Sequence, residues 1–378
     1  PDPCRGSDMP LLNEMLNESS RKRLEHERLA AENEGAAVPA QSLGSAAIES
    51  RYRFDVDGIM AAVRSEILGQ DEALAALERA LRIVRADIAD PRRPLHTALF
   101  LGPTGVGKTE MVRALARALH GDADAFCRID MNTLAQEHYA AALTGAPPGY
   151  VGSKEGTTLF DQSLIEGSIG KPGIVLFDEL EKASDEVVQA LLNVFDNGRL
   201  TVASGERTYS FRNSLVFMTS NLGAKRIQAH ERAKSRWPRR LLPPSPQRDR
   251  RVLTKLAEHE LLRCFTPEFV NRIDTITVFN WLDKGILGAL IDMEIQRINR
   301  RLAKHGVTLH LGPAVKQYIV RIGFDRKFGA RSLRRVIRQH VEAPLAVFLL
   351  NELQRSDSPQ KLEAYLEAGS VKFRHEGT

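Results

Sequence analysis

The sequence contains few cysteines and no long hydrophobic run. Its three cysteines, Cys4, Cys127 and Cys264, lie far apart and lack the spacing of a disulfide framework or of a zinc site. No stretch approaches the roughly 18 uncharged apolar residues that a membrane helix requires. These absences argue against a secreted disulfide-rich protein and against a membrane protein, and they predict a cytoplasmic location. The 378 residues, 43% of them hydrophobic, are enough for two domains with buried cores.

Outside one segment, the chain has no excess of positive charge. Residues 225–255 hold eleven Lys or Arg and two Asp or Glu, whereas the whole chain has a net charge of +5. The rest of the chain is therefore acidic, at about −4. This basic segment is rich in proline and arginine, and a solvated loop is its simplest interpretation. A docking site for an acidic partner or for nucleic acid is the alternative.

The N-terminal region is polar and has few apolar residues. Residues 1–8 precede Met9 and read as a leader. A helix over residues 19–33 would have Leu24 and Leu29 among its few apolar positions. We therefore expect residues 1–50 to form a leader followed by a weakly ordered helical extension.

From residue 51 onward, short apolar runs alternate with helical patterns. Helical spacing is present over 71–88 and 106–119. The runs that predict strands are 98–101, 126–129, 174–177, 215–218 and 275–279. Near-continuous apolar strands separated by helices indicate a buried parallel sheet. We predict a large α/β domain over 51–282, with a parallel five-stranded sheet between helices.

The pattern changes after residue 282. Long helical patterns over 284–305 and 331–351 dominate the remaining sequence. Two short segments, 307–311 and 370–373, read as strands that can pair with each other. We predict a smaller, mainly helical C-terminal domain over 283–378.

A glycine-rich motif lies between the first predicted strand and the next helix. The run Gly102-Pro103-Thr104-Gly105-Val106-Gly107-Lys108-Thr109 matches G-x-x-x-x-G-K-T, in the context that this phosphate-binding loop requires. Glycines allow several backbone N–H groups to face one phosphate, and the helix N-terminus adds partial positive charge. Lys108 is expected to reach the β- and γ-phosphates of ATP, and Thr109 to bind Mg²⁺ through its hydroxyl.

Two acidic residues follow the third predicted strand. A buried strand that ends in Asp178-Glu179 places both carboxylates at the edge of the sheet beside the phosphate-binding loop. Asp178 is expected to hold Mg²⁺, and Glu179 to orient and deprotonate the attacking water. The sequence therefore predicts ATP hydrolysis as well as ATP binding.

Several further strings resemble the Clp family of AAA+ unfoldases and disaggregases, in particular their C-terminal ATPase module. The resemblance runs from about residue 54 to residue 373. The matching strings are GAPPGYVG at 145–152, LFDELEKA at 176–183, DNGRLT at 196–201, MTSNLG at 218–223, PEFVNRID at 267–274 and GARSLRR at 329–335. The presence of one phosphate-binding loop suggests a single-ring machine or a fragment of a larger protein.

The resemblance implies roles for residues outside the phosphate-binding loop. Asn221 resembles the polar sensor that reads the γ-phosphate, and Arg331 resembles the second sensor, carried by the small domain. Arg272 resembles the arginine finger, which acts on the neighbouring subunit's nucleotide, so the sites are expected to lie between subunits of a ring, by analogy a hexamer. Leu68-Gly69-Gln70 resembles the segment that lines the adenine pocket.

A second implication of the resemblance concerns the substrate. Tyr150 and Val151 resemble the loop that lines the axial channel and grips unfolded polypeptide, a task suited to a large amphipathic side chain. Residues 205–207 resemble a second, lower channel loop. The residues that follow Tyr150, SKEGT at 153–157, make this channel more basic than is usual for the family. The tripeptide by which family members dock the Clp peptidase is not found between residues 224 and 265.

Three functions remain open from the sequence. The favoured one is an ATP-driven protein unfoldase that threads polypeptide through a ring. The second is a nucleic-acid-associated AAA+ ATPase anchored by residues 225–255. The third is a nucleotide-gated scaffold without hydrolysis, which the presence of Glu179 and Arg272 disfavours.

Overall fold

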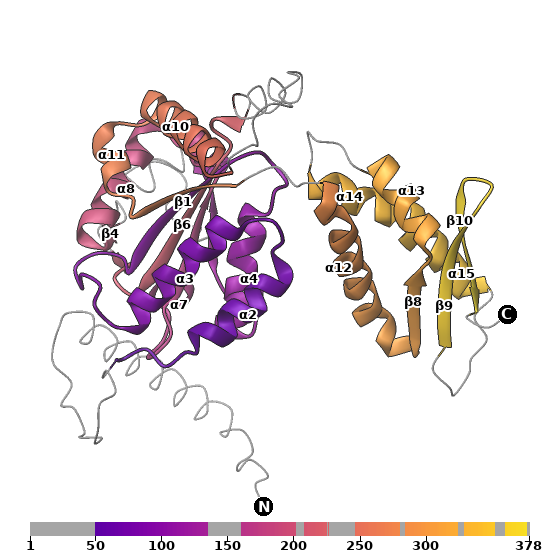
Figure 1. Cartoon of the computed structure of the whole chain (residues 1–378). Coiled ribbons are helices and arrows are strands. Elements are labelled where there is room, and N and C mark those ends of the chain that lie inside the picture. The colour runs from indigo at the N-terminus through magenta and orange to yellow at the C-terminus, as the bar shows by residue number, and fades with distance from the viewer. Residues whose placement is uncertain are drawn as a thin grey trace, which may run out of the picture.

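Five parallel strands form the central sheet of the larger unit (Figure 1). The computed structural model describes residues 50–134, 160–201, 208–224, 226, 246–279, 284–323, 329–351 and 360–375. The strands of the central sheet, in spatial order, are β2 Cys127–Asp130, β3 Gly173–Asp178, β6 Ser214–Ser220, β1 His96–Leu101 and β7 Thr275–Val278. Every neighbouring pair is parallel, which confirms the predicted α/β fold.

Alternate residues of these strands face two separate hydrophobic cores. In β1, Leu99 and Leu101 join one core, whereas Ala98 and Phe100 join the other. Every residue of β1, β3 and β6 is buried. Because helices cover both faces, strands of this kind are apolar along their whole length. That burial explains why short apolar runs were sufficient to predict them.

Each face of the central sheet has its own set of helices. The helices over the face of Ala98 and Phe100 are α2 Val56–Glu66, α3 Asp71–Arg85 and α4 Lys108–His120. The helices over the opposite face are α5 Met131–Leu134, α7 Gln162–Glu166, α8 Asp185–Asn197, α10 Pro246–Cys264 and α11 Pro267–Asn271.

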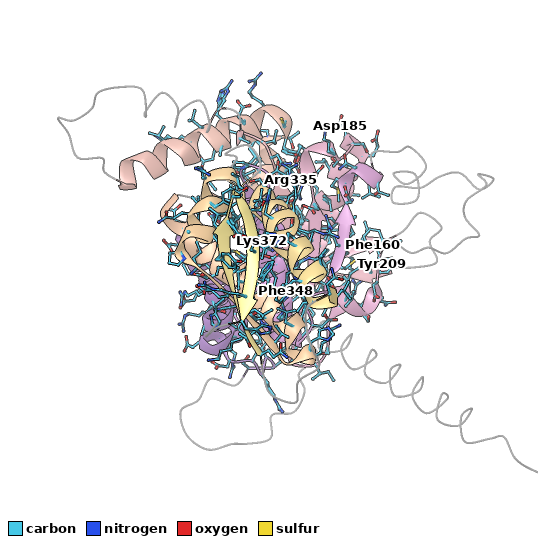
Figure 2. The ribbon with its side chains drawn as sticks, turned by 90° about the vertical axis from the view of Figure 1, so that its right-hand side faces the viewer. Phe160, Asp185, Tyr209, Arg335, Phe348 and Lys372 are labelled. Atoms are coloured by element: carbon cyan, nitrogen blue, oxygen red, sulfur yellow. The ribbon has the colours of Figure 1, made fainter. Side chains whose placement is uncertain are left out.

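A small hairpin extends the second layer. Strands β4 Arg199–Thr201 and β5 Thr208–Ser210 pair antiparallel directly after α8. The Tyr209 ring packs against Phe160 with ring centroids 5.3 Å apart, and Figure 2 shows the two side chains together. A 3₁₀ turn, η1 Leu180–Lys182, follows β3 in the same layer. These elements were not predicted, because each is only three residues long.

The smaller unit combines helices with a three-stranded sheet around its own core (Figure 1). Its elements are α12 Lys284–Leu302, the 3₁₀ turn η2 Ala303–His305, β8 Val307–Leu311, α13 Pro313–Gly323, α14 Ala330–Ile337, the π-helical turn η3 Arg338–Glu342, α15 Ala343–Asn351, β9 Gln360–Glu367 and β10 Ser370–His375. The predicted boundary near residue 282 falls within 280–283, outside the described residues, and stays a prediction.

Both expected strands, 307–311 and 370–373, belong to one sheet, but they do not pair with each other directly. Strand β9 lies between β8 and β10, parallel to β8 and antiparallel to β10. In β9 the charged residues Lys361 and Glu363 alternate with the buried Leu362 and Ala364. Only one face of β9 packs on the core, so its sequence mixes charged and apolar residues and lacks the continuous apolar run by which the other strands were predicted.

Other predicted bounds also need correction. The helix predicted over 71–88 ends at Arg85, and a turn with Asp87 at a φ of 54° replaces its last residues. The helix predicted over 331–351 is divided by the π-helical turn η3. The end of the basic segment, from Pro246, is the start of α10 and not a loop. Residues 227–245 lie outside the described residues.

Among the helices that the structure describes, none combines the length and the apolar character needed to cross a lipid bilayer.

Candidate nucleotide site

The loop 102–109 connects the end of β1 to the start of α4. Gly102 donates its N–H to the Ser220 carbonyl at 3.2 Å. Its φ is 141°, and a Cβ atom at this position would lie 2.5 Å from the carbonyl oxygen of Phe279. A side chain is therefore excluded here, which gives a physical reason for the first glycine of the motif.

The Lys108 side chain points into the loop and is buried. Its Nζ donates to the carbonyl oxygens of Gly102 and Pro103, at 2.5 and 2.9 Å. It also donates to Asn221 Oδ1 at 3.0 Å. The ammonium thus lies inside the loop, next to Asn221, the polar residue that directly follows β6.

The protonation of Lys108 is sensitive to its surroundings. Burial lowers the pKa of Lys108 to about 8, because the charged ammonium loses solvent. The carboxylates of Glu181, Asp178 and Glu179 oppose this shift, whereas Arg331 adds to it. These four charged residues therefore lie close enough to Lys108 to share one electrostatic environment.

Asp178 ends β3 and is almost fully buried. Its Oδ2 accepts hydrogen bonds from Arg128 Nε and Nη2, at 3.1 and 2.6 Å. Its Oδ1 accepts a hydrogen bond from the Thr219 hydroxyl. Thr109, on the first turn of α4, is half-buried at the same edge of the sheet. A carboxylate and a hydroxyl are oxygen ligands of the kind that Mg²⁺ prefers.

Glu179 has an unusual backbone conformation. Its φ is 60° and its ψ is 51°, in the left-handed region that non-glycine residues rarely adopt. The Glu179 N–H donates to Thr219 Oγ1 at 3.1 Å, and Oε2 accepts from Asn132 Nδ2 at 2.6 Å. These two contacts fix the backbone and the carboxylate of the residue predicted to act as the base.

Asn221 is oriented by a second acid. Its Nδ2 and its backbone N–H both donate to Glu181 Oε1, at 3.0 and 3.1 Å. This pairing turns the amide oxygen of Asn221 toward Lys108. The other carboxylate oxygen, Glu181 Oε2, is buried and has no hydrogen-bond partner among the described residues.

The smaller unit contacts the phosphate-binding loop directly. The Ala330 N–H donates to the Gly105 carbonyl at 3.0 Å. A Cβ atom on Gly329, whose φ is 53°, would lie 2.7 Å from that same oxygen. Arg331 follows at once, and its charge reaches Lys108. The structure therefore brings the predicted second sensor to the loop.

The segment 68–70 lies between the loop and the smaller unit. Gln70 Nε2 donates to the Val106 carbonyl at 3.2 Å. A Cβ atom on Gly69 would lie 2.4 Å from Ile286 Cδ1 of α12. The segment that resembles the lining of the adenine pocket therefore lies against both the phosphate-binding loop and the smaller unit.

Arg272 lies at the opposite edge of the central sheet. Its carbonyl oxygen accepts from Thr97 Oγ1 at 3.2 Å, at the start of β1, whereas the phosphate-binding loop follows the end of that strand. Five residues of strand span roughly 16 Å. The Arg272 guanidinium pairs instead with Asp196, with Nη1 2.8 Å from Oδ1. Of the predicted site residues that the structure describes, Arg272 is thus the one not brought to the loop of its own chain.

The predicted channel residues Tyr150 and Val151 lie outside the described residues. The same is true of the second predicted channel loop, 205–207.

The sequence did not single out Arg128, Asn132, Thr219 or Glu181. Each of them contacts a predicted site residue: Arg128 and Thr219 from the strands β2 and β6, and Asn132 and Glu181 from the turns α5 and η1 that follow β2 and β3. Arg128 and Asp178, for example, come together because β2 lies parallel to β3, with Asp130 opposite Asp178. Glu181 and Thr219 carry an earlier signal, since they belong to the strings LFDELEKA and MTSNLG.

Two family models match the chain. The AAA domain (Cdc48 subfamily) matches residues 93–276, and the C-terminal, D2-small domain, of ClpB protein matches residues 282–360.

Individual relatives agree with these matches. The chain is 60% identical, over 92% of its length and 95% of the relative, to the ATP-dependent protease ATP-binding subunit-like protein AmiB of Pseudomonas aeruginosa. It is 41% identical to the chaperone protein ClpB 2 of Thermosynechococcus vestitus, over 77% of this chain and 31% of that longer protein. A solved structure, the closed state of Hsp104 with ATPγS and FITC casein, matches with a TM-score of 0.69 at 28% identity. That match covers 84% of this chain and 51% of the Hsp104 chain.

Proposed function

The chain belongs to the Clp-type AAA+ ATPases, and from this premise we propose that it is an ATP-driven protein unfoldase that works as a ring. The arrangement of Lys108, Asp178, Glu179 and Asn221 around one edge of the sheet is the observation that carries the hydrolytic part of the proposal. Its relatives are named as chaperones and as ATP-binding subunits of proteases, and these names support the part of the proposal that makes protein the substrate.

Each described residue of the site has a role in this proposal. Lys108 and the N–H groups of the loop bind the phosphates, and Thr109 and Asp178 would hold Mg²⁺. The metal would supply charge neutralisation at the phosphates. Glu179 takes a proton from the attacking water, and Asn132 holds its carboxylate before that step.

The small unit and a neighbouring subunit complete the site. Arg331 lies close to Lys108 and senses the nucleotide from the small unit. Arg272 is assigned to the adjoining subunit's nucleotide, in keeping with its place at the far edge of its own sheet. We propose a ring, by analogy a hexamer, in which Tyr150 and Val151 grip polypeptide in the axial channel.

The test of this function uses two variants of the full chain. Glu179→Gln is expected to bind ATP, to lose more than about 99% of turnover and to lock an oligomer that size analysis and electron microscopy detect as a ring. Tyr150→Ala is expected to keep most of its ATPase activity while losing the unfolding of a tagged test protein. Normal turnover by Glu179→Gln, or undiminished unfolding by Tyr150→Ala, would remove the corresponding role.

The nucleic-acid alternative receives no support from these relatives. Salt-dependent DNA binding that disappears when residues 225–255 are trimmed would be needed to revive it. Peptidase docking is also not part of the proposal, because the docking tripeptide is not found between residues 224 and 265, where the family carries it.

A further inference from the structure

The backbone of Arg272 is held by two side chains that the proposed mechanism does not use. Its carbonyl oxygen accepts from Arg93 Nη2 at 3.1 Å and from Thr97 Oγ1 at 3.2 Å. We propose that Arg93 and Thr97 are positioning residues that set where the arginine finger projects toward the neighbouring subunit. This inference rests on the proposed role of Arg272.

Arg93 joins the finger to helix α8. Its Nε donates to the Phe195 carbonyl at 2.9 Å, while its Nη2 donates to the Arg272 carbonyl. Its Nη2 also lies 3.7 Å from Asp274 Oδ1. One rigid guanidinium thus fixes the distance between two backbone segments, a task that its planar fork performs and a lysine ammonium cannot.

Thr97 joins the finger to strand β1. The Thr97 N–H donates to Asp274 Oδ2 at 2.8 Å, and the Asp274 N–H donates to Thr97 Oγ1 at 3.0 Å. The Thr97 hydroxyl shares its hydrogen between Asp274 Oδ2, at 2.8 Å, and the Arg272 carbonyl. Thr97 is fully buried, so these hydrogen bonds have no competing solvent. The backbone of the finger is therefore hydrogen-bonded to the start of β1, the strand that the phosphate-binding loop follows.

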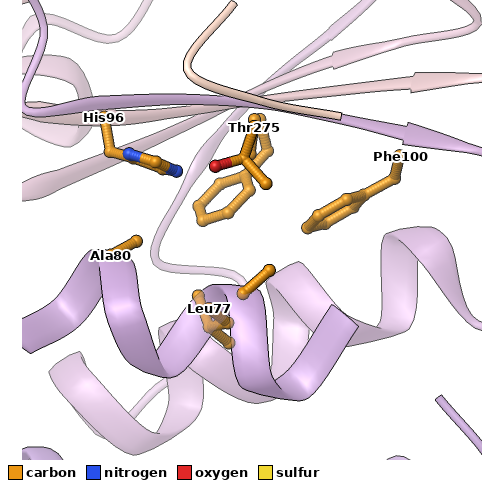
Figure 3. Close-up of a pocket in the computed structure, with 8 residues that line it drawn as sticks. Leu77, Ala80, His96, Phe100 and Thr275 are labelled. Atoms are coloured by element: carbon orange, nitrogen blue, oxygen red, sulfur yellow. The ribbon is translucent and has the colours of Figure 1, made fainter. Parts of the chain in front are cut away.

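Two cavities lie on the α3 side of this region. A cavity of about 330 Å³ is lined by Arg93, His96 and Asp274. A smaller apolar cavity of about 10 Å³ adjoins it, and Figure 3 shows Ala80, His96 and Thr275 on its walls. Ile273 and Phe269 anchor the turn in the hydrophobic core on its other side, and the hydrogen bonds of Arg93 and Thr97 fix it on the side of these cavities.

The finger side chain is held less firmly than its backbone. The ion pair between Arg272 and Asp196 is partly exposed, with side-chain exposures of 43% and 30%, and pairs of that kind are weak. A terminal phosphate carries more charge than a carboxylate and can replace Asp196. The arrangement therefore combines a fixed backbone with an exchangeable side-chain partner.

The first set of variants removes the backbone contacts. Arg93→Ala and Thr97→Val are expected to lower kcat for ATP about ten- to a hundredfold, because a displacement of about 1 Å at a catalytic group can cost about a hundredfold. The KM for ATP is expected to stay within about twofold. Thr97→Ser, which keeps the hydroxyl, should restore turnover, and Arg93→Lys should not. Arg92→Ala is the matched control, since Arg92 pairs with Asp90 two residues away.

The second measurement mixes subunits, because a finger acts on the neighbour's site. A subunit with a defective finger keeps its own intact phosphate-binding loop. A Glu179→Gln neighbour has an intact finger, which can complete the nucleotide site at that loop. Arg93→Ala and Arg272→Ala should therefore each recover activity when mixed with Glu179→Gln. A mixture of Arg93→Ala with Arg272→Ala should stay inactive, and so should Lys108→Ala with Glu179→Gln.

The outcomes separate the inference from the proposed function. If Arg272→Ala turns over normally, the finger role fails and the inference fails with it. Suppose that Arg272→Ala hydrolyses ATP slowly and recovers activity when mixed with Glu179→Gln. If Arg93→Ala and Thr97→Val then hydrolyse ATP normally, or slowly without recovery on mixing, the positioning role fails and the finger role stands. Thermal unfolding of each variant identifies a folding defect. If Thr97→Val has such a defect, the ATP turnover of Thr97→Ser shows whether the hydroxyl is required.

Discussion

Glu179 is strained in the structure, and its neighbours explain why the strain persists. A left-handed conformation costs a non-glycine residue about 1–2 kcal/mol. Two hydrogen bonds, from Asn132 to the carboxylate and from the Glu179 N–H to Thr219, hold the residue there. Strain of this kind often marks functional sites, because the surrounding contacts over-determine the conformation.

The lowered pKa of Lys108 predicts a pH-dependent affinity for ATP. Without nucleotide, Lys108 loses its proton as the pH rises through about 8, whereas the phosphates of bound ATP stabilise its charged form. The affinity of Glu179→Gln for ATP should therefore fall about tenfold between pH 7 and pH 9. Calorimetric titration at several pH values measures this.

The matched control for this pH effect is Lys108→Ala in the same background. It should bind ATP weakly at every pH and lack the fall between pH 7 and pH 9. An equal fall in both proteins would assign the pH effect to another group.

The same pKa shift means that the stability of the nucleotide-free chain rises between about pH 8 and pH 10.5, where the unfolded chain holds the proton and the folded chain does not.

At the scale of residues, the sequence predicted the groups that a motif names and missed the groups that orient them. Lys108, Asp178 and Asn221 stand at fixed places in recognisable strings. Asn132 and Thr219 act only because separate strands bring them beside Glu179. Their contacts depend on the pairing of strands far apart in the sequence, which no local pattern records.

At the scale of elements, burial decides which strands and helices a sequence reveals. Strands β1, β3 and β6 are covered on both faces and read as apolar runs. Strand β9 is covered on one face, and its charged residues hid it. Helix α12 was predicted closely, since its apolar residues recur at helical spacing along its whole length.

Helix α12 also offers a prediction about stability. Gly288 lies within this helix, and a Cβ atom there would meet no other heavy atom within 4 Å. Gly288→Ala should therefore raise the free energy of unfolding of the small unit by about 0.5–1 kcal/mol. Gly323→Ala is the control without this gain, because its Cβ atom would lie 3.1 Å from Leu333 Cδ1. Denaturant unfolding measures both variants, and a loss of stability in Gly288→Ala would contradict the prediction.

At the scale of the whole molecule, a set of charges joins the small unit to the large one. Arg297 of α12 lies 2.6 Å from Glu110 of α4 and 3.8 Å from Glu66 of α2, in each case measured from Nη2. Arg334 of α14 reaches the same Glu110 at 3.8 Å. Because Arg331 belongs to α14, these pairs also affect where the second sensor lies.

Loss of Arg297 should therefore weaken nucleotide binding from a distance. Arg297→Ala is expected to raise the Kd for ATP about three- to tenfold, since a partly buried pair in a network contributes on the order of 1 kcal/mol. Arg301→Ala is the matched control, because Arg301 pairs with Glu342 inside the small unit. Equal effects of the two substitutions on the Kd would show that a general loss of charge, and not the contact between units, is responsible.

The approach of Phe279 to Gly102 has a mechanical consequence. The chain leaves the large unit in contact with the phosphate-binding loop, at Phe279, and returns to the same loop at Gly329 and Ala330. Helix α12 begins close to this pivot and, with 19 residues, is roughly 28 Å long. A rotation of about 10° at the pivot would move the far end of such a rod by roughly 5 Å. If the loop rearranges on gaining or losing a phosphate, a rotation of the small unit about this pivot would be amplified into a displacement of that size at the far end of α12.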